Sequence, residues 1–239
     1  MMRKTLLAAA LSVTAFAAQA DYQCSVTPRD DVIISPQTVQ VKGENGDLVI
    51  SPDGSLTFNG KARNLTAAQR EQAKDYQAEL RSTLPWVDDG ARSRVEKGRV
   101  ALDKIIAEQV GESSNMRGRL TKLDAQLKTQ MNRIIERRTD GLTFHYKAID
   151  QVRADGQTLV NQAMGGILQD SINEMGAKAV IKGGGNPLQG ILGNLGGLQT
   201  AIQDEWKNQE ADFQKFGKDV CSRVVSLEDQ RKALVGGLK

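Results

Sequence analysis

A long stretch with helical periodicity near the carboxyl end constrains this chain more than any other feature. Between residues 195 and 227 the larger apolar residues recur at the spacing of one face of a helix. They are Leu195, Leu198, Ile202, Trp206, Phe213, Phe216, Val220, Val224 and Leu227. Cys221 lies on the same face, and the second cysteine, Cys24, lies near the other end of the chain. The sequence therefore predicts one long helix that offers both a core surface and a covalent anchor for the N-terminal part.

The first 20 residues have the features of a secretory signal peptide. Arg3 and Lys4 form a short basic region, residues 6–16 form an apolar run, and Ala18-Gln19-Ala20 matches a small-x-small cleavage site. The alternative, a transmembrane anchor, is disfavoured because the run is shorter than the roughly 20 apolar residues that a span needs. We expect cleavage after Ala20, export of the chain, and no transmembrane span after cleavage.

Export places Cys24 and Cys221 in an oxidising compartment, where two cysteines of one chain most simply pair. Their bridge would close a loop of 197 residues, counted from 24 to 221. The chain-entropy model gives such a bridge at most about 5 kcal/mol of stability. A metal or redox role lacks support because the CxxC spacing is absent and His145 is the only histidine. The sequence predicts a disulfide, with no metal site and no cofactor.

The charge of the chain excludes one class of partner. Loss of Arg3 and Lys4 with the signal peptide lowers the net charge from +3 to +1, and acidic and basic residues are interspersed. A nucleic-acid-binding protein needs a basic surface to neutralise phosphates, so we expect no nucleic-acid partner. Aromatic residues make up only 4% of the chain, so the core must depend mainly on aliphatic side chains.

The N-terminal part has the period-two pattern of short strands. Apolar pairs spaced i, i+2 are separated by turn residues, and Asn59-Gly60 suits a type I′ hairpin turn. The pairs are Val39 and Val41, Leu48 and Ile50, and Leu56 and Phe58. We expect residues 21–64 to form a small antiparallel β-meander. A sheet this small is only marginally stable on its own. Its apolar face should therefore pack against helices.

The remainder, residues 65–239, is predicted to be helical. Thr66 and Gln69 have the spacing of a capping box, which starts a first helix. Pro85 disfavours the helical conformation at Leu84, so this helix should end near Ser82. A second helix should then start at Asp88 or Asp89, where an acidic side chain can cap it.

Later helices are less clearly bounded. Apolar spacing predicts a third helix over residues 120–135, ending near Asp140-Gly141, and a fourth over residues 149–175, interrupted by glycines. Residues 142–146 are β-prone and could extend the third helix, join the sheet or start the fourth helix. Residues 176–197 are rich in glycine, which favours a flexible or closely packed connector before the last helix.

Few residues suggest chemistry. His145 is a candidate general base, but the sequence names no partner for it. Asp88-Asp89, with Asp30-Asp31 far upstream, could supply a carboxylate pair, although helix capping alone explains acidic residues at such a position. The run from Gly183 to Pro187 lacks the Gly-Lys-Ser/Thr ending of a phosphate-binding loop, which favours a linker.

A partner surface is the more interesting candidate. Leu188, Ile191, Leu192 and Leu195 lie among closely spaced glycines and could dock on a protein or lipid partner. The alternative is that the same segment packs in the core.

In its order of short motifs the chain resembles the YggN-like family of uncharacterised exported proteins of Gram-negative bacteria. The motifs are Cys24-Ser25-Val26, Leu48-Val49-Ile50, Gly54 to Gly60, Leu65 to Gln69, Tyr76, Pro85 and the distant Cys221. The resemblance covers essentially the whole mature chain and implies the periplasm as compartment. It implies no catalytic residue, cofactor or substrate.

These observations predict an α+β fold in which a small N-terminal antiparallel β-meander packs on a larger antiparallel helical bundle. We expect one structural unit joined by the bridge between Cys24 and Cys221. The leading functional hypothesis is a non-enzymatic periplasmic protein that binds a partner or ligand, as a chaperone-like or envelope-maintenance factor. The alternatives are a periplasmic hydrolase that uses His145 or an aspartate, and a structural protein that self-associates. The oligomeric state is left open.

Overall fold

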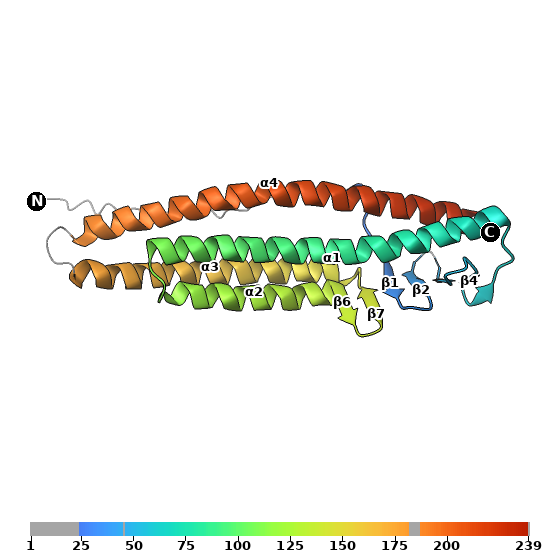
Figure 1. The fold of residues 1–239 in the computed structure, drawn as a ribbon, viewed down its shortest axis with the longest axis horizontal. Coiled ribbons are helices and arrows are strands. Elements are labelled where there is room, and N and C mark those ends of the chain that lie inside the picture. The colour runs from blue at the N-terminus through green and yellow to red at the C-terminus, as the bar shows by residue number, and fades with distance from the viewer. Residues whose placement is uncertain (1–23, 45, 182–186, 239) are drawn as a thin grey trace, which may run out of the picture.

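The computed structural model describes residues 24–44, 46–181 and 187–238. Side chains are described for all of these except residue 168 and residues 175–195. The described part is an elongated rod of helices with a β-sheet at one end (Figure 1). The fold class is α+β, as predicted.

Four helices form the rod. They are α1 (Ala67–Gln109), α2 (Asn115–Ile134), α3 (Ala148–Ile181) and α4 (Pro187–Gly236). α1 and α4 run antiparallel along almost the whole rod, whereas α2 and α3 form an antiparallel pair beside the half that lies away from the sheet (Figure 1). The predicted capping box is present at the start of α1, where the Thr66 and Gln69 side chains bond each other's backbone N–H.

The predicted break near Ser82 is wrong. Pro85 lies inside α1, which continues without interruption for 43 residues. A proline in a helix interior costs about 3 kcal/mol. Packing on both sides offsets this cost, since Leu80 and Leu84 are buried against the sheet and Trp86 packs on α4. Neither Asp88 nor Asp89 caps a helix.

Two further boundaries differ from prediction. α2 ends at Ile134 rather than near Asp140, because residues 135–138 form a strand. α3 is not interrupted at Gly156 or Gly165, where the surrounding space is open, and α4 begins at Pro187 rather than near residue 195. The helices therefore occupy most of the segment that was expected to be a connector.

One antiparallel sheet of seven strands covers the N-terminal end of α1 and the C-terminal end of α4. The strands are β1 (Asp30–Ile34), β2 (Val39–Gly43), β3 (Leu48–Ile50), β4 (Leu56–Phe58), β5 (Lys61–Ala62), β6 (Ile135–Arg138) and β7 (Gly141–Phe144). Their order is β5-β4-β3-β2-β1-β7-β6. The predicted meander is thus present, and the β-prone residues 142–144 join the sheet: Ile34 of β1 pairs with Leu142 of β7.

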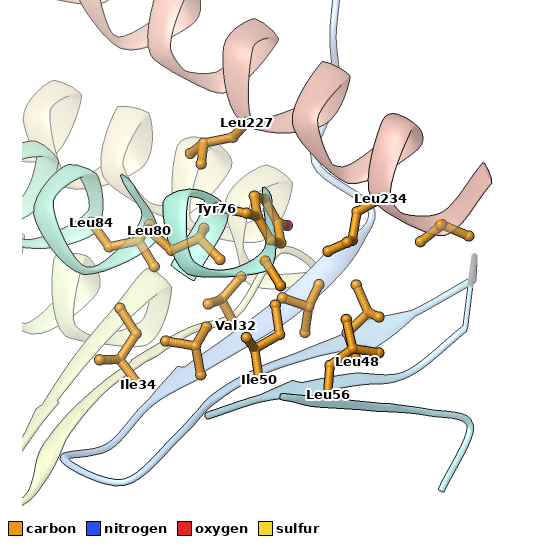
Figure 2. Close-up of a cluster of buried hydrophobic side chains, with 14 of the residues drawn as sticks. Val32, Ile34, Leu48, Ile50, Leu56, Tyr76, Leu80, Leu84, Leu227 and Leu234 are labelled. Carbon is orange, nitrogen blue, oxygen red and sulfur yellow. The ribbon is translucent and has the colours of Figure 1, made fainter. Parts of the chain in front are cut away.

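The first of two hydrophobic cores, which we call the proximal core, lies between the sheet and the helices α1 and α4. Figure 2 shows Tyr76, Leu80 and Leu84 of α1 between the inner face of the sheet and α4. α4 contributes Leu227 and Leu234 from above (Figure 2). The sheet contributes Val32, Ile34, Val39, Val41, Leu48, Ile50, Leu56 and Phe58. Alternation of buried and half-buried residues along β1 to β4 gives the sheet one apolar face, as predicted.

The second core, which we call the distal core, lies at the far end of the rod, where all four helices meet. Its buried residues are Ile106 of α1, Val110 at the C-cap of α1, Met116 and Leu120 of α2, Ile167 of α3 and Leu198 of α4. Ser171 is also buried there and donates a hydrogen bond to the carbonyl oxygen of Ile167.

The structure pairs Cys24 with Cys221, as the sequence predicts. Their Cα atoms are 5.5 Å apart, and the bridge spans 197 residues. It fastens the segment before β1 to α4 close to the proximal core. The sheet and the last helix are therefore joined both by packing and by a covalent bond.

Candidate functional site: the waist of the rod

The middle of the rod, which we call the waist, has no buried side chain. It comprises residues 89–105 of α1, 121–134 of α2, 153–166 of α3 and 199–215 of α4, and every residue in these four segments is exposed or half-buried. A segment of 17 residues at 1.5 Å per residue is about 25 Å long. Helix packing normally buries an apolar stripe along the whole contact. The waist is therefore an interval without a fully buried side chain. At its edges, half-buried Leu102, Ile105, Met164 and Ile202 pack against the distal core and Ile134 against the proximal core.

Ion pairs link neighbouring helices across the waist. Arg94 of α1 donates to Asp212 of α4 at 3.0 Å, and Lys128 of α2 donates to Glu96 of α1, also at 3.0 Å. Arg133 of α2 pairs with Asp155 of α3. These pairs show that the four segments lie level with one another along the rod. In this interval charged contacts take the place of buried apolar ones.

Glu96 is a carboxylate of the waist that accepts hydrogen bonds from two cationic side chains. Hydrogen bonds from Arg99 and Lys128 lower the pKa of Glu96 to about 2. Arg133 and Gln151 donate to Asp155 and likewise hold its pKa below the usual value. Both groups are therefore charged at neutral pH and serve as anchors for cations rather than as proton donors or acceptors.

Two large aromatic side chains of the waist are exposed to solvent. Trp206 is 43% exposed and Phe213 is 42% exposed. They are seven residues apart in α4, so they lie on the same flank of that helix. Ile202, one turn before Trp206 on this flank, is half-buried and packs against the distal core. Trp206 and Phe213 therefore extend, into the waist, the flank on which Ile202 reaches the distal core.

This exposure corrects part of the predicted core face of the last helix. Leu198, Phe216 and Leu227 are buried as expected, but Trp206 and Phe213 are not. α1 packs along the line from Leu198 to Phe216, because Arg94 and Gly90 of α1 contact Asp212 and Phe216 there. Trp206 and Phe213 lie to one side of this line.

An aromatic stack closes the waist on the side of the sheet. The rings of Trp86 and Phe216 lie 5.2 Å apart. The guanidinium carbon of Arg94 lies 4.0 Å from the centre of the Phe216 ring, and that of Arg223 lies 4.3 Å from the Trp86 ring. Cations over aromatic faces are favourable, so this stack fixes α4 against α1 where the proximal core ends.

The predicted partner surface cannot be placed in this site. Leu188, Ile191, Leu192 and Leu195 belong to α4, but their side chains lie outside the described residues. Residues 183–186 of the glycine-rich run also lie outside the described part, and Pro187 is the first residue of α4.

His145 lies between two carboxylates beside the sheet. Its Nε2 atom is 3.4 Å from Oε2 of Glu136, and its Nδ1 atom is 3.9 Å from Oδ2 of Asp31. The imidazole side chain is 38% exposed. Within the described residues no hydroxyl or thiol lies within hydrogen-bond distance of the ring. The geometry therefore joins β1 and β6 through His145 and presents no nucleophile to it.

The two aspartate pairs are not brought together. Asp88 is buried, accepts from Arg92 at 2.9 Å and pairs with Arg137 of β6, which also pairs with Asp89. This network ties α1 to the β6–β7 hairpin, a structural role. Asp30 accepts from Arg231 of α4 at 3.1 Å. Burial, the main cause, raises the pKa of Asp30, and Arg231 partly opposes that effect.

An open polar pocket of about 720 Å³ lies above this buried pair of Asp30 and Arg231. It is formed by the turns of the sheet and the C-terminal end of α4. Its charged lining residues are Glu44, Asp47, Glu228, Arg231 and Lys232. Both signs of charge are present, so the pocket does not favour one class of ionic ligand.

Two negative findings hold for the described part of the chain. Its His, Cys, Asp and Glu side chains form no group of three or more that could hold a metal ion. Its helices include none whose length and apolar character together would allow it to cross a membrane.

Comparison with known proteins places this chain in a family. A family model described as a protein of unknown function (DUF2884) matches residues 24–239. The chain belongs to this family. "Uncharacterized protein YggN" of Escherichia coli strain K12 is 81% identical over 239 residues and is covered over its full length, as is this chain. The protein of the same description from Escherichia coli O157:H7 shows the same identity and coverage. No solved structure matches the chain.

The apolar periodicity of the helices does not predict the waist, although the sequence carries a signal of it. Residues 91–100 read Ala-Arg-Ser-Arg-Val-Glu-Lys-Gly-Arg-Val, which leaves two large apolar residues in almost three turns of helix. A helix that is polar nearly all round either crosses solvent between two packed regions or is stabilised by ion pairs. Reading each helix for gaps in its apolar stripe, and not only for the stripe, would have indicated this interval.

Proposed function

We propose that this protein is an exported, non-enzymatic binding protein of the bacterial envelope that binds an amphipathic helix of another polypeptide at its waist. Export is supported by the features of a signal peptide in residues 1–20 and by the disulfide between Cys24 and Cys221. The periplasm is the compartment that this proposal assigns to the mature chain.

The observation that carries the proposal is the exposure of Trp206 and Phe213 on one flank of α4. A protein that buries aliphatic residues efficiently at both ends of the rod leaves two of its few aromatic residues in water. Aromatic residues dominate the energetics of interfaces because each buries a large area at a low cost in side-chain entropy. Two such residues on one flank are typical of anchors for a partner.

The geometry favours a helix as the partner segment. Trp206 and Phe213 are seven residues apart, about 10.5 Å along the α4 axis, which matches the spacing of residues i and i+7 on a partner helix. The waist is about 25 Å long and would accommodate about 17 helical residues. Glu210 lies between the two aromatics on the same flank, and a basic residue of the partner would pair with it. That carboxylate would repel an anionic lipid surface.

Binding can be measured with Trp206 as the reporter. Trp86→Phe leaves Trp206 as the only tryptophan, so its fluorescence reports on the waist alone. The probe is a synthetic 17-residue amphipathic helix with leucines at i, i+3, i+4 and i+7 and lysines beside them. The control peptide has the same composition in scrambled order. We expect saturable quenching or a blue shift with the probe and none with the scrambled peptide.

Matched substitutions test the site. Phe213→Ser should weaken binding at least tenfold, a loss of about 1.4 kcal/mol. Val100→Ser removes an exposed apolar side chain from α1, 51% exposed against 42% for Phe213, and should leave binding unchanged. Equal binding of both peptides, or an equal effect of the two substitutions, would overturn the proposal. Binding only to anionic vesicles would assign the flank to a membrane, and a concentration-dependent dimer mass would assign it to a second copy of the chain.

Photo-crosslinking in cells would then identify the natural partner. Crosslinkers at positions 206 and 213 probe the aromatic flank, and crosslinkers at the exposed positions 208 and 215 probe other sides of the same helix. A polypeptide adduct specific to 206 and 213 that carries an amphipathic helix is the expected result. Adducts that form equally from all four positions would contradict a defined site.

A further inference from the structure

All four helices are fixed to one another at the distal end of the waist, and α1 and α4 are also fixed at the sheet end. At the distal end, Ile106, Met116, Ile167 and Leu198 bring one buried residue from each helix into the distal core. At the other end, α1 and α4 are held by the proximal core and the aromatic stack, and the Cys24–Cys221 bridge adds a covalent link. The waist is therefore a span between two anchors.

Between these anchors the helices are linked by ion pairs and by half-buried side chains, with no fully buried residue. Every residue of the four waist segments is at least partly exposed, and the described contacts between helices include the pairs Arg94–Asp212, Glu96–Lys128 and Arg133–Asp155. Ion pairs at such positions contribute little to stability and are screened by salt. The Debye length falls from about 8 Å at 0.15 M ionic strength to about 3 Å at 1 M.

Separation of the helices in the waist requires only a bend in each helix. Long helices curve readily without breaking their backbone hydrogen bonds. Figure 1 shows α4 arched over the length of the rod. Because both ends stay fixed, the helices can bow apart without loss of either core. The side chains that this motion would uncover include Leu123, Leu127 and Met131 of α2, which are half-buried in the waist.

We propose that the waist is a conformational device held closed by interhelical ion pairs, in which the helices bow apart when the pairs are screened or removed while both cores remain closed. Opening enlarges the apolar surface of the waist. The inference concerns the free protein, so it can fail while the proposed binding function holds, and the reverse is also true.

Distances between spin labels test the inference on the full mature chain. The two native cysteines are bridged, so introduced cysteines can be labelled selectively. Ser93→Cys with Thr129→Cys spans α1 and α2 in the waist, and Glu108→Cys with Asn115→Cys spans the same two helices at the distal core; all four positions are exposed. Between 0.05 and about 1 M salt, a range that shortens the Debye length severalfold, we expect the waist distance to lengthen and broaden. The distal distance should not change.

A matched pair of substitutions separates the ion pairs from general effects of salt. Lys128→Gln removes the link from α2 to Glu96 and should lengthen the waist distance at low salt, with little further response to salt. Lys104→Gln makes the same chemical change within α1, where Lys104 pairs only with Glu108 of its own helix among the described residues, and should have no effect. A distance between the waist labels that changes neither with salt nor with Lys128→Gln would overturn the inference. So would an equal lengthening at the distal core.

Discussion

Gly90 of α1 lies directly against the ring of Phe216 of α4. A Cβ atom on Gly90 would lie 2.5 Å from Cε2 of the ring, well inside van der Waals contact. The ring cannot retreat freely, because Trp86 lies against it and the Arg94 guanidinium covers it at 4.0 Å. This close approach sets the distance between α1 and α4 at the sheet end of the waist.

Gly90→Ala should therefore destabilise the protein. Overpacking of this kind costs about 1–3 kcal/mol, which outweighs the helical preference of alanine. Gly98→Ala is the control, because it lies in the same helix with no atom within 4 Å of its Cβ position. It should raise stability by about 0.5–1 kcal/mol. Urea unfolding of the two variants measures both changes, and a shift of the same sign in both would contradict the close contact.

Much of the fold follows from local sequence patterns. The meander, the capping box at Thr66, the apolar face of the last helix and the pairing of Cys24 with Cys221 all depend on spacing and compartment, which the sequence displays directly. Pro85 shows where such reasoning ends. Pro85 disfavours a helical conformation at Leu84 and so predicts a break, but the packing of Leu84 on the sheet and of Trp86 on α4 overrides this preference.

The candidate site was harder to predict than the fold. The sequence marks Trp206 and Phe213 as apolar residues at helical spacing, and that spacing alone indicates burial. Their exposure depends on the direction from which α1 approaches α4, which the contact of Gly90 with Phe216 sets. The direction from which one helix packs on another cannot be predicted from the apolar periodicity of either helix alone.

Loss of the Cys24–Cys221 bridge should lower stability mainly through the unfolded state. Replacing both cysteines by serine releases a loop of 197 residues, which the chain-entropy model values at up to about 5 kcal/mol. The thermal midpoint should fall, and residues near Cys24 should exchange faster with solvent. Reduction of the wild-type protein should reproduce both effects. Ser222→Ala, which changes the exposed neighbour of Cys221, is the control and should alter neither the midpoint nor the exchange. If the variant with both cysteines replaced by serine had the same thermal midpoint as the wild type, the bridge would add no stability.

Arg231→Met should be among the most damaging single substitutions. Arg231 is 4% exposed and donates to Asp30 at 3.1 Å and to the carbonyl oxygen of Gly46 at 3.2 Å. Removing one member of a buried ion pair costs about 3–5 kcal/mol, because the other charge is left without a partner. Adding Asp30→Asn to Arg231→Met should restore part of the loss. Lys232→Met, at an exposed neighbouring position, should cost less than about 0.5 kcal/mol.

A full double-mutant cycle in urea would measure the coupling between Asp30 and Arg231. Additive losses from the two single substitutions would show that the two residues do not act as a pair.

Acid should destabilise the rod, whereas at the sheet end the shifted pKa of Asp30 should act in the opposite direction. Hydrogen bonds from Arg99 and Lys128 hold the pKa of Glu96 at about 2, and Arg117 and Arg119 lower the pKa values of Asp103 and Asp170. These carboxyls bind protons more weakly in the folded state than in the unfolded state. Their contribution to stability is therefore present above about pH 4.5 and is lost as the pH falls through the folded values toward 2.

The contribution of Asp30 to stability depends on pH in the opposite direction. Burial raises its pKa in the folded state, so it binds a proton more readily there than in the unfolded chain. Its contribution becomes more favourable as the pH falls through the folded pKa toward 3.8. Urea unfolding between pH 6 and 2.5 should show a net loss of stability, since the lowered carboxyls outnumber Asp30. Glu96→Gln should make that loss shallower and Asp30→Asn should make it steeper. Identical slopes in the two variants would show that these two groups do not govern the acid response.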